Sequence, residues 1–214
     1  MVLDTFQAIA DVAHADAVLR SQIQHHRDRV SYLFSGSEQG ILRGLFSERA
    51  APLFGQAERF ELGPLPQSVA TDYVADQFDA TGRSAGTALG ALVHAAAGHP
   101  QRLNLLAHHL WNLTPDGGQA GEDIWREAYA ATLAYARPEL LAVWNGIGGN
   151  HRRSLRLSAW GEPQFGAAAR RLGLSGGSAT AARDVLEQRS VIDTQGAIVD
   201  PLLASWIRQE HPSP

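Results

Sequence analysis

Cysteine and lysine are both absent from this sequence, and all 18 of its basic residues are arginine. Without cysteine, neither a disulfide framework nor a thiolate metal site can form. Without lysine, the chain cannot contain a phosphate-binding loop of the form GxxxxGK[ST]. The arginine-only composition fits a GC-rich, alanine-rich genome better than selection for phosphate binding, so a single arginine carries little functional weight by itself.

Long apolar runs are also missing. No stretch approaches the roughly 20 apolar residues that a membrane-spanning helix needs, and the N-terminus lacks a charged region followed by an apolar signal segment. These features predict a soluble, cytoplasmic protein. With 44% apolar residues the chain can bury one large core or two modest ones, and we expect two or three small units.

Charge is unevenly distributed along the chain. Residues 1–127 hold 9 arginines against 15 acidic residues, a net charge of −6, whereas residues 129–214 hold 9 against 7, a net charge of +2. The acidic front part repels nucleic acid, and the back part attracts a phosphate backbone only weakly. The charge balance therefore gives no indication of a strong nucleic-acid-binding surface.

Two strand ends near the N-terminus carry polar side chains. VSYLF, residues 30–34, is typical of a buried strand and leads into Ser35, while the apolar run at residues 1–3 leads into Asp4. Nucleotide-binding α/β proteins place polar groups at the carboxyl ends of neighbouring parallel strands, and a carboxylate there can hold the water shell of magnesium. We therefore expect Asp4 and Ser35 to lie together as half of a nucleotide site.

Hydrophobic periodicity places the other elements. Helices are expected over residues 15–26, 37–46, 67–78, 85–97, 100–113, 124–136, 140–147, 164–172 and 178–188. Ser37 is expected to cap the second of these, and Asp200 to cap a final helix that starts at Pro201. Short strands are expected over residues 59–62 and on both sides of a Gln-Gly turn within residues 191–199.

This order of elements predicts an α/β plus α protein with three parts. Residues 1–65 have the β-α-β order of a parallel sheet. Residues 66–118 form an all-helical unit. Residues 119–214 form a connecting helix and then a winged helix-turn-helix, because helices, a turn, a helix and a hairpin follow one another.

The same motifs resemble one known family along nearly the whole chain. They are VLDTFQ (2–7), LFSGSE (33–38), LFGQAERFELGPL (53–65), GHPQRLNLLAHHLW (98–111) and VDPLLASWI (199–207). In this order they are similar to the archaeal-type ATPase family of the signal-transduction P-loop ATPases, which are AAA-like and also occur in bacteria. The resemblance makes the first motif a Walker B segment and the second a sensor 1 segment. It also implies that residues 1–65 are the C-terminal part of a P-loop ATPase core and that residues 66–118 are its all-helical lid.

Residue roles follow from this resemblance. It implies that Asp4 orients magnesium through water and that Ser35 reads the γ-phosphate of ATP, which makes both catalytic and cofactor-binding residues. The Gly-any-Pro motif of the lid falls at Gly98 and Pro100, with the proline near the adenine. Arg102 follows this motif and would be a second γ-phosphate sensor, unless it is a solvated arginine on an amphipathic helix.

Two departures limit what the resemblance implies. The chain lacks the Walker A loop, and Thr5 replaces the catalytic glutamate that follows the Walker B aspartate, although threonine is no general base at neutral pH. Asp4 and Thr5 can alternatively be read as caps of the next helix. We expect a C-terminal ATPase fragment, from a truncated gene or a misassigned start, that needs its N-terminal half or a protein partner. ATP and magnesium belong to the full-length parent, with weak or no binding and little or no hydrolysis here.

Two other functions remain open, a winged-helix DNA-binding regulator and a protein-interaction module without chemistry. In the first, residues 178–188 would be the recognition helix. Arg183 is its only basic side chain and the nucleic-acid candidate, while Asp184 and Glu187 repel phosphates. The regulator is therefore the less favoured of the two.

Two histidine pairs and one arginine cluster are further candidates for binding sites. Adjacent histidines at 25–26 and 108–109 point about 100° apart on a helix, which makes a shared metal ion unfavourable. Arg152, Arg153 and Arg156 form the densest basic cluster. They either meet phosphates or belong to a solvated turn.

Overall fold

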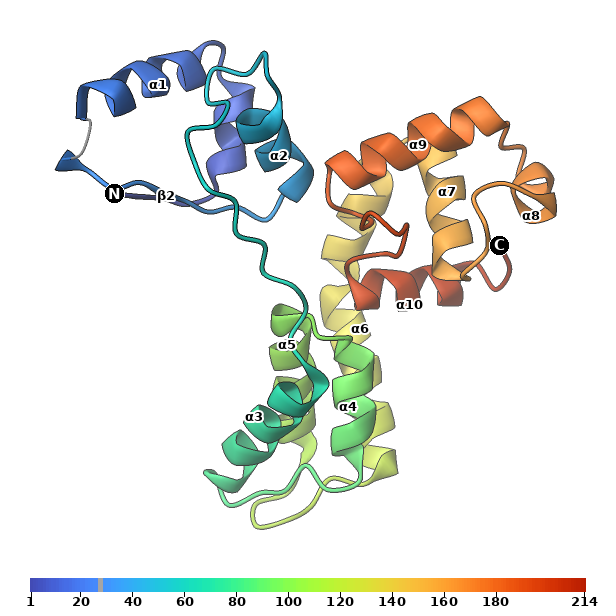
Figure 1. Ribbon diagram of the computed structural model, residues 1–214. Coiled ribbons are helices and arrows are strands. Elements are labelled where there is room, and N and C mark those ends of the chain that lie inside the picture. Colours follow the sequence, from blue (N-terminus) through green and yellow to red (C-terminus); the bar gives the residue numbers. More distant parts are fainter. Residues whose placement is uncertain (27–28) are drawn as a thin grey trace. The chain divides into compact units, whose positions relative to one another are not determined.

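The computed structural model describes residues 1–26 and 29–214, and these are mostly helical (Figure 1). The chain divides into two compact units. The first comprises Met1–Glu61 and Ala181–Gly196, and the second comprises Leu62–Thr180 and Ala197–Pro214. Among the described residues, none of the helices combines the length and apolar character needed to cross a lipid bilayer.

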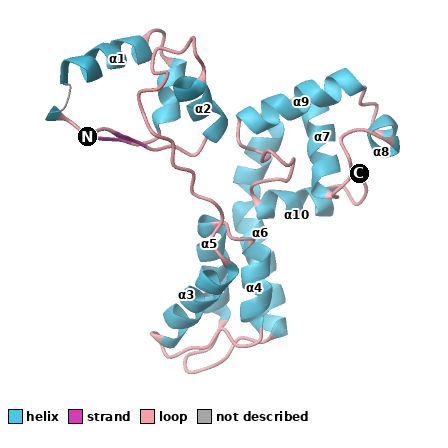
Figure 2. Cartoon of the chain, viewed as in Figure 1, coloured by secondary structure: helices cyan, strands magenta, loops and turns pink. Residues whose placement is uncertain are grey.

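The first unit contains a small parallel sheet of β1 (Val2–Leu3) and β2 (Leu33–Phe34), drawn in magenta in Figure 2. Val2 lies opposite Leu33, which confirms the predicted parallel pairing of the two strands. The predicted buried strand over residues 30–34 is wrong, because only two of its residues are in the ladder and Leu33 is 61% exposed. Val2, on the same face of the sheet, is 66% exposed.

The other face of this sheet covers a hydrophobic core. Phe6, Leu45 and Leu53 are the buried members of the core, and the ring of Phe34 packs on it with its centroid 4.5 Å from that of Phe6. Three helices of this unit surround these residues, namely η1 (Phe6–Asp11), a 3₁₀ helix, with α1 (Ala15–His26) and α2 (Gln39–Ser47). The helix predicted over residues 15–26 is confirmed.

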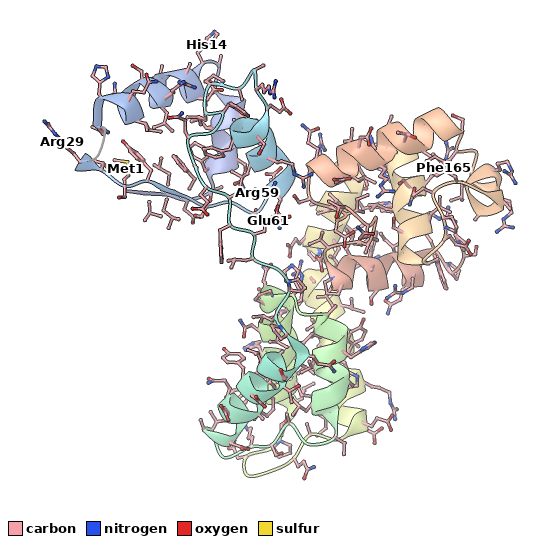
Figure 3. All side chains as sticks on the ribbon, in the orientation of Figure 1. Met1, His14, Arg29, Arg59, Glu61 and Phe165 are labelled. Atoms are coloured by element: carbon pink, nitrogen blue, oxygen red, sulfur yellow. The ribbon has the colours of Figure 1, made fainter. Side chains whose placement is uncertain are left out.

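Two local predictions for this part of the chain are wrong. Ser37 does not cap α2, since the helix begins two residues later, with Glu38 at the N-cap position. Residues 59–62 form no strand, although Arg59 and Glu61 do alternate with apolar residues and pair at 3.3 Å (Figure 3). Phe60 is 86% exposed. Without a partner strand or a core beneath it, alternation alone does not make a strand.

The second unit begins with four helices that pack on one another. They are α3 (Gln67–Asp79), α4 (Ala88–Ala96), α5 (Pro100–Leu113) and α6 (Glu122–Asn145), with α5 packed against both α4 and α6. Leu103, Leu106 and Leu110 follow one stripe of α5 and are at most 1% exposed. The predicted bounds of α5 are confirmed.

α6 runs through Pro138 as one helix, so the prediction of two helices over 124–136 and 140–147 is wrong. Proline lacks the amide hydrogen and costs about 3 kcal/mol inside a helix. Ala136 and Leu140 lie on either side of it and are 2% and 0% exposed. Packing of these two residues in the core compensates for the missing hydrogen bond.

Three further helices complete the second unit, and α9 (Gly176–Gln188) starts in it. The three are α7 (Gly149–Ala159), α8 (Ala167–Arg171) and α10 (Pro201–Glu210). α10 packs on α6 and α7. Asp200 caps it by accepting from the amides of Leu202 and Leu203 at 2.9 and 3.4 Å, which confirms the predicted cap and Pro201 as the first helical residue.

The segment from residue 191 to 199 contains no strand of two or more residues, only single bridge positions at Ile192 and Ile198. Its predicted turn is present. The Gly196 amide donates to the carbonyl of Asp193 at 2.9 Å, and Gly196 has a φ of +87°. The predicted hairpin strands are therefore wrong.

Candidate functional site

Asp4 and Ser35 lie at the carboxyl ends of the two parallel strands, and the structure brings them together. The Ser35 hydroxyl donates to Asp4 Oδ1 at 2.5 Å. Backbone hydrogen bonds fix this arrangement, because the Ser35 amide donates to the carbonyl of Leu3 at 2.9 Å and the Phe6 amide to the carbonyl of Ser35 at 2.8 Å. We call Asp4, Ser35 and the residues that hold them the strand-end site.

The strand-end site is open and negatively charged. The hydrogen bond from Ser35 and then that from the Thr5 amide lower the pKa of Asp4 below its usual value, while slight desolvation opposes them. Asp4 is exposed, and because its pKa is lowered, its carboxylate is ionised at neutral pH. Its second oxygen and the lone pairs of the Ser35 hydroxyl are acceptors, which suit the waters of a hydrated divalent cation.

The chain turns sharply after Asp4. Thr5 has a φ of +53°, in the left-handed region that a β-branched residue rarely adopts and that costs about 1–3 kcal/mol. Thr5 occupies the N-cap position of η1, but its side chain makes no capping bond, so the alternative interpretation of Thr5 as a cap is wrong. The turn instead directs Phe6 and Gln7 into the unit, where both are buried.

Gln7 is a site residue that the sequence interpretation missed. It is 8% exposed, and its Nε2 donates to the Ser37 hydroxyl at 3.4 Å. Its Oε1 is buried without a hydrogen-bond partner in the part of the chain that is described. A glutamine between apolar residues near a turn gives no sequence signal of burial, because glutamine is usually at the surface.

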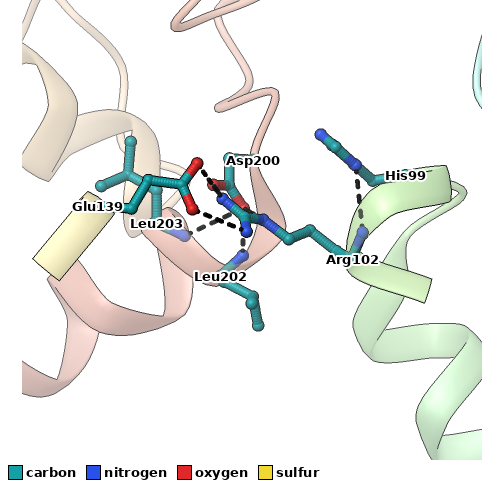
Figure 4. A network of polar contacts seen from close by, with 6 residues as sticks. All are labelled: His99, Arg102, Glu139, Asp200, Leu202 and Leu203. Atoms are coloured by element: carbon teal, nitrogen blue, oxygen red, sulfur yellow. Dashed lines mark hydrogen bonds and ion pairs between the residues drawn. The ribbon is translucent and has the colours of Figure 1, made fainter. Parts of the chain in front are cut away.

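A second polar cluster, in the other unit, surrounds Arg102 (Figure 4). Arg102 is 3% exposed. Its guanidinium donates to both oxygens of Asp200, at 3.1 and 2.6 Å, and to both oxygens of Glu139, at 3.1 and 3.2 Å. We call these three residues the Arg102 network, which joins the first turn of α5 to the C-terminal third of α6 and to the cap of α10.

Neither sequence interpretation of Arg102 describes this arrangement. The solvated arginine is wrong because the side chain is buried. Burial lowers the pKa of Arg102, but the hydrogen bonds and charges of Asp200 and then Glu139 outweigh it and raise that pKa, so the side chain remains a cation. Four of its N–H groups donate to carboxylates within the unit. Sequence reasoning identified Asp200 only as a cap and missed Glu139.

The Gly98-His99-Pro100 motif is the turn between α4 and α5. Ala97 and Gly98 have φ values of +47° and +75°. A Cβ on Gly98 would lie 2.8 Å from the carbonyl oxygen of Leu65, so this position needs glycine for space as well as for conformation. His99 Nδ1 accepts from the Arg102 amide at 3.4 Å as the N-cap, and Pro100 is the first helical residue. Turn geometry explains the residue types at 98, 99 and 100.

The remaining basic candidates are engaged in local structure. Arg152 belongs to α7 and donates to the carbonyls of Trp144 and Asn145 at 2.8 and 3.3 Å. Its positive charge thereby stabilises the C-terminal end of α6. Arg156 donates to the carbonyl of Ser213 at 2.9 Å. The predicted solvated turn at residues 152–156 is therefore wrong. Arg183 donates to the carbonyl of Thr194 at 2.6 Å.

The described residues hold no group of three or more side chains that could bind a metal ion. His108 and His109 lie edge to face at 5.5 Å. Burial, and then the charge of His108, lower the pKa of His109.

Comparisons of the chain with protein-family models, with curated proteins and with solved structures found no match. The geometry of the strand-end site and of the Arg102 network is therefore the basis for inferring function.

Proposed function

We propose that this chain is the C-terminal part of an ATP-binding P-loop ATPase of the archaeal, signal-transduction type. In the full-length protein it acts as a nucleotide-dependent switch, and alone it has little or no ATPase activity. The observation that carries the proposal is the hydrogen bond of 2.5 Å between Ser35 and Asp4 at the ends of adjacent parallel strands.

The chemistry of these two residues supports a magnesium site. Magnesium keeps most of its waters in nucleotide sites and is held through one or two carboxylates together with the phosphates. Asp4 supplies an ionised carboxylate, and the Ser35 hydroxyl fixes the orientation of that carboxylate. The left-handed Thr5 gives the site a strained backbone, which is a common feature of ligand sites.

The same residues support weak nucleotide binding and no hydrolysis by this chain. Most phosphate affinity in P-loop proteins comes from the backbone amides and the lysine of the P-loop, and this chain has no lysine. Thr5 follows Asp4 where a general base would be needed. Nucleotide state therefore has to act through the missing P-loop.

A DNA-binding regulator has less support. Arg183 is the only basic side chain in the predicted recognition helix, and its guanidinium already donates to Thr194. Asp184 and Glu187 beside it repel phosphates. Base readout needs donors that are free to enter a groove, and this helix offers few.

Manganese titration of the ¹⁵N-labelled chain tests the proposal, because Mn²⁺ replaces Mg²⁺ at oxygen ligands and broadens nearby amide signals. We expect selective broadening at Phe6, Ser35 and Gly36, and its loss in Asp4→Asn. Asp11→Asn is the matched control, an exposed carboxylate of the same unit, and leaves the broadening unchanged. Broadening spread evenly over all acidic residues would refute a magnesium site at Asp4.

A further inference from the structure

We infer that Gln7 is a positioning residue of the strand-end site, which holds the Ser35–Gly36–Ser37 turn against the Asp4 strand. This inference rests on the proposed function for the meaning of the site. Gln7 lies three residues after Asp4 and is 8% exposed. Its carboxamide reaches across to the Ser37 hydroxyl at 3.4 Å, so it links the segment after β1 to the turn after β2.

Stability alone does not account for a glutamine at this position. Its Oε1 is buried and finds no partner among the residues that the structure describes, and an unpaired buried carbonyl oxygen destabilises the folded state. Exchange of the amide nitrogen and oxygen would pair the oxygen with Ser37 and leave the nitrogen unpaired instead. An apolar side chain of the same length would fill the space without this penalty. A residue that breaks a local rule in this way is expected at a functional site.

Gly36 provides the complementary evidence. Its φ lies outside the left-handed region, so backbone conformation does not require glycine there. Space favours it, since a Cβ on Gly36 would lie 2.1 Å from Gln7 Oε1, 3.2 Å from Leu42 Cδ1 and 3.3 Å from Gln7 Cδ, so the Gln7 carboxamide would have to move. The carboxamide of Gln7 therefore packs directly under the Gly36 backbone. Any side chain at position 36 would displace the carboxamide from Ser37.

The contact of Gln7 with this turn affects the hydrogen bond between Ser35 and Asp4. Ser35 precedes Gly36 directly, and its hydroxyl must remain at 2.5 Å from Asp4 Oδ1 for the acceptor oxygens to stay arranged. Gln7 is buried beside the turn, whereas the hydrogen bond between Ser35 and Asp4 lies at the exposed surface. Gln7 thus acts through Ser35 and does not contact the ligand itself. It pre-organises the oxygens that hold the waters of the divalent cation.

The experiment compares Gln7→Met, Gly36→Ala and the double variant Gln7→Ala/Gly36→Ala in the full chain. Three quantities are measured: the thermal midpoint, the hydrogen-exchange rate of the Phe6 amide that donates to Ser35 at 2.8 Å, and the Mn²⁺ concentration that half-broadens Gly36. Gly44→Ala, whose Cβ meets nothing closer than 3.5 Å, is the control for an added methyl group.

For Gln7→Met we expect a thermal midpoint at or above that of the wild type. Exchange at Phe6 should be faster by about fivefold, the size expected for one lost hydrogen bond, and Mn²⁺ binding should be weaker by a similar factor. Gly36→Ala should give the same two losses. The double variant should be no worse than Gly36→Ala alone, because both substitutions act by removing the same carboxamide from Ser37.

Two results would overturn the inference. Wild-type exchange and Mn²⁺ response in Gln7→Met would show that Gln7 only fills space. A double variant worse than Gly36→Ala alone would show that the two positions do not share one space. The proposed function fails separately, if wild-type Gly36 does not respond to Mn²⁺ while the exchange rates still change as expected.

Discussion

Arg102 and Asp4 are both charged side chains near the ends of secondary-structure elements, but their surroundings are opposite. Arg102 is 3% exposed and donates four hydrogen bonds to two carboxylates of its own unit. Asp4 is exposed and accepts one side-chain hydrogen bond, from Ser35. The first group is satisfied internally, and the second retains acceptor capacity toward solvent.

This difference separates a residue that supports the fold from one that is available to a ligand. The family resemblance assigned both residues to ATP, since both occur in the expected motifs. In the structure, Arg102 would have to leave Glu139 and Asp200 before it met a phosphate, whereas Asp4 needs no rearrangement to meet a hydrated cation. Motif position alone does not distinguish these cases, but burial and partners do.

The largest effect is expected for Arg102→Met. Removal of one partner from a buried ion pair leaves the other charges unpaired, and we expect the free energy of unfolding to fall by about 3 kcal/mol. Urea denaturation followed by tryptophan fluorescence measures it. Arg126→Met is the control, because Arg126 and its partner Asp123 are 70% and 91% exposed, and it should change stability by less than about 0.5 kcal/mol. Equal losses of stability in the two variants would show that the buried Arg102 network supports the fold no more than an exposed ion pair does.

Asp200 allows the two functions of one carboxylate to be separated. Asp200→Asn keeps an oxygen that can cap α10 but loses the charge toward Arg102. Asp200→Ala loses both, and we expect it to be less stable than Asp200→Asn by about 1 kcal/mol, the usual contribution of an N-cap. Thermal unfolding of both variants, each compared with the wild type, gives the difference. If the two variants unfold alike, the cap contributes nothing beyond the ion pair.

A smaller effect is expected from pH. The pKa of His109 is lowered from 6.5 by burial and then by His108. The folded state therefore binds the proton less readily than the unfolded state, so stability is complete above pH 6.5 and falls as the pH drops below it. His109→Gln should reduce the loss of thermal midpoint between pH 7.5 and about pH 5.

The control for this prediction is His94→Gln, since His94 is exposed on α4 of the same unit. His211 also has a lowered pKa, from burial and then Arg156, and it contributes part of the same loss. A pH profile that is unchanged in His109→Gln would place the whole effect at His211 or elsewhere.

Regular helices of the chain could be predicted because their pattern is local. The stripe of Leu103, Leu106 and Leu110 gives the bounds of α5, and Asp200 followed by Pro201 gives the start of α10. α7 could not be predicted, because three arginines within five residues read as a solvated turn. Their long side chains instead reach carbonyl and side-chain acceptors around the helix, for example Arg152 to Trp144.

Long-range partners could be predicted only where topology constrains them. Parallel pairing of two strands brings Asp4 to Ser35, and this follows from strand order alone. Nothing local connects Arg102 with Glu139 and Asp200, which lie 37 and 98 residues away in the sequence. The burial of Gln7 could not be predicted either, because it depends on the left-handed backbone conformation of Thr5.

The smallest effect is expected at the open site itself. Mg-ATP should bind this chain with a Kd above roughly 1 mM, because the P-loop amides and lysine that supply most phosphate affinity are absent. The chain should not hydrolyse ATP, because Thr5 cannot take the proton of an attacking water. Asp4→Ala should change neither result. Calorimetric titration and a phosphate-release assay are the measurements.

The titration also sharpens the contrast between the two charged residues. If Mg-ATP bound in the micromolar range and Arg102→Lys weakened it while Asp4→Ala did not, Arg102 would leave its carboxylates for the nucleotide, and the closed network would be the ligand site. Turnover on the order of 1 per second, typical of enzymes, would require another residue to activate the water. Glu38, which directly follows Ser37 in the sequence, would be the first candidate. Millimolar binding that is insensitive to both substitutions is the outcome that we expect, since Glu139 and Asp200 already hold the Arg102 guanidinium. A single carboxylate that holds a cation through water adds little affinity for the nucleotide.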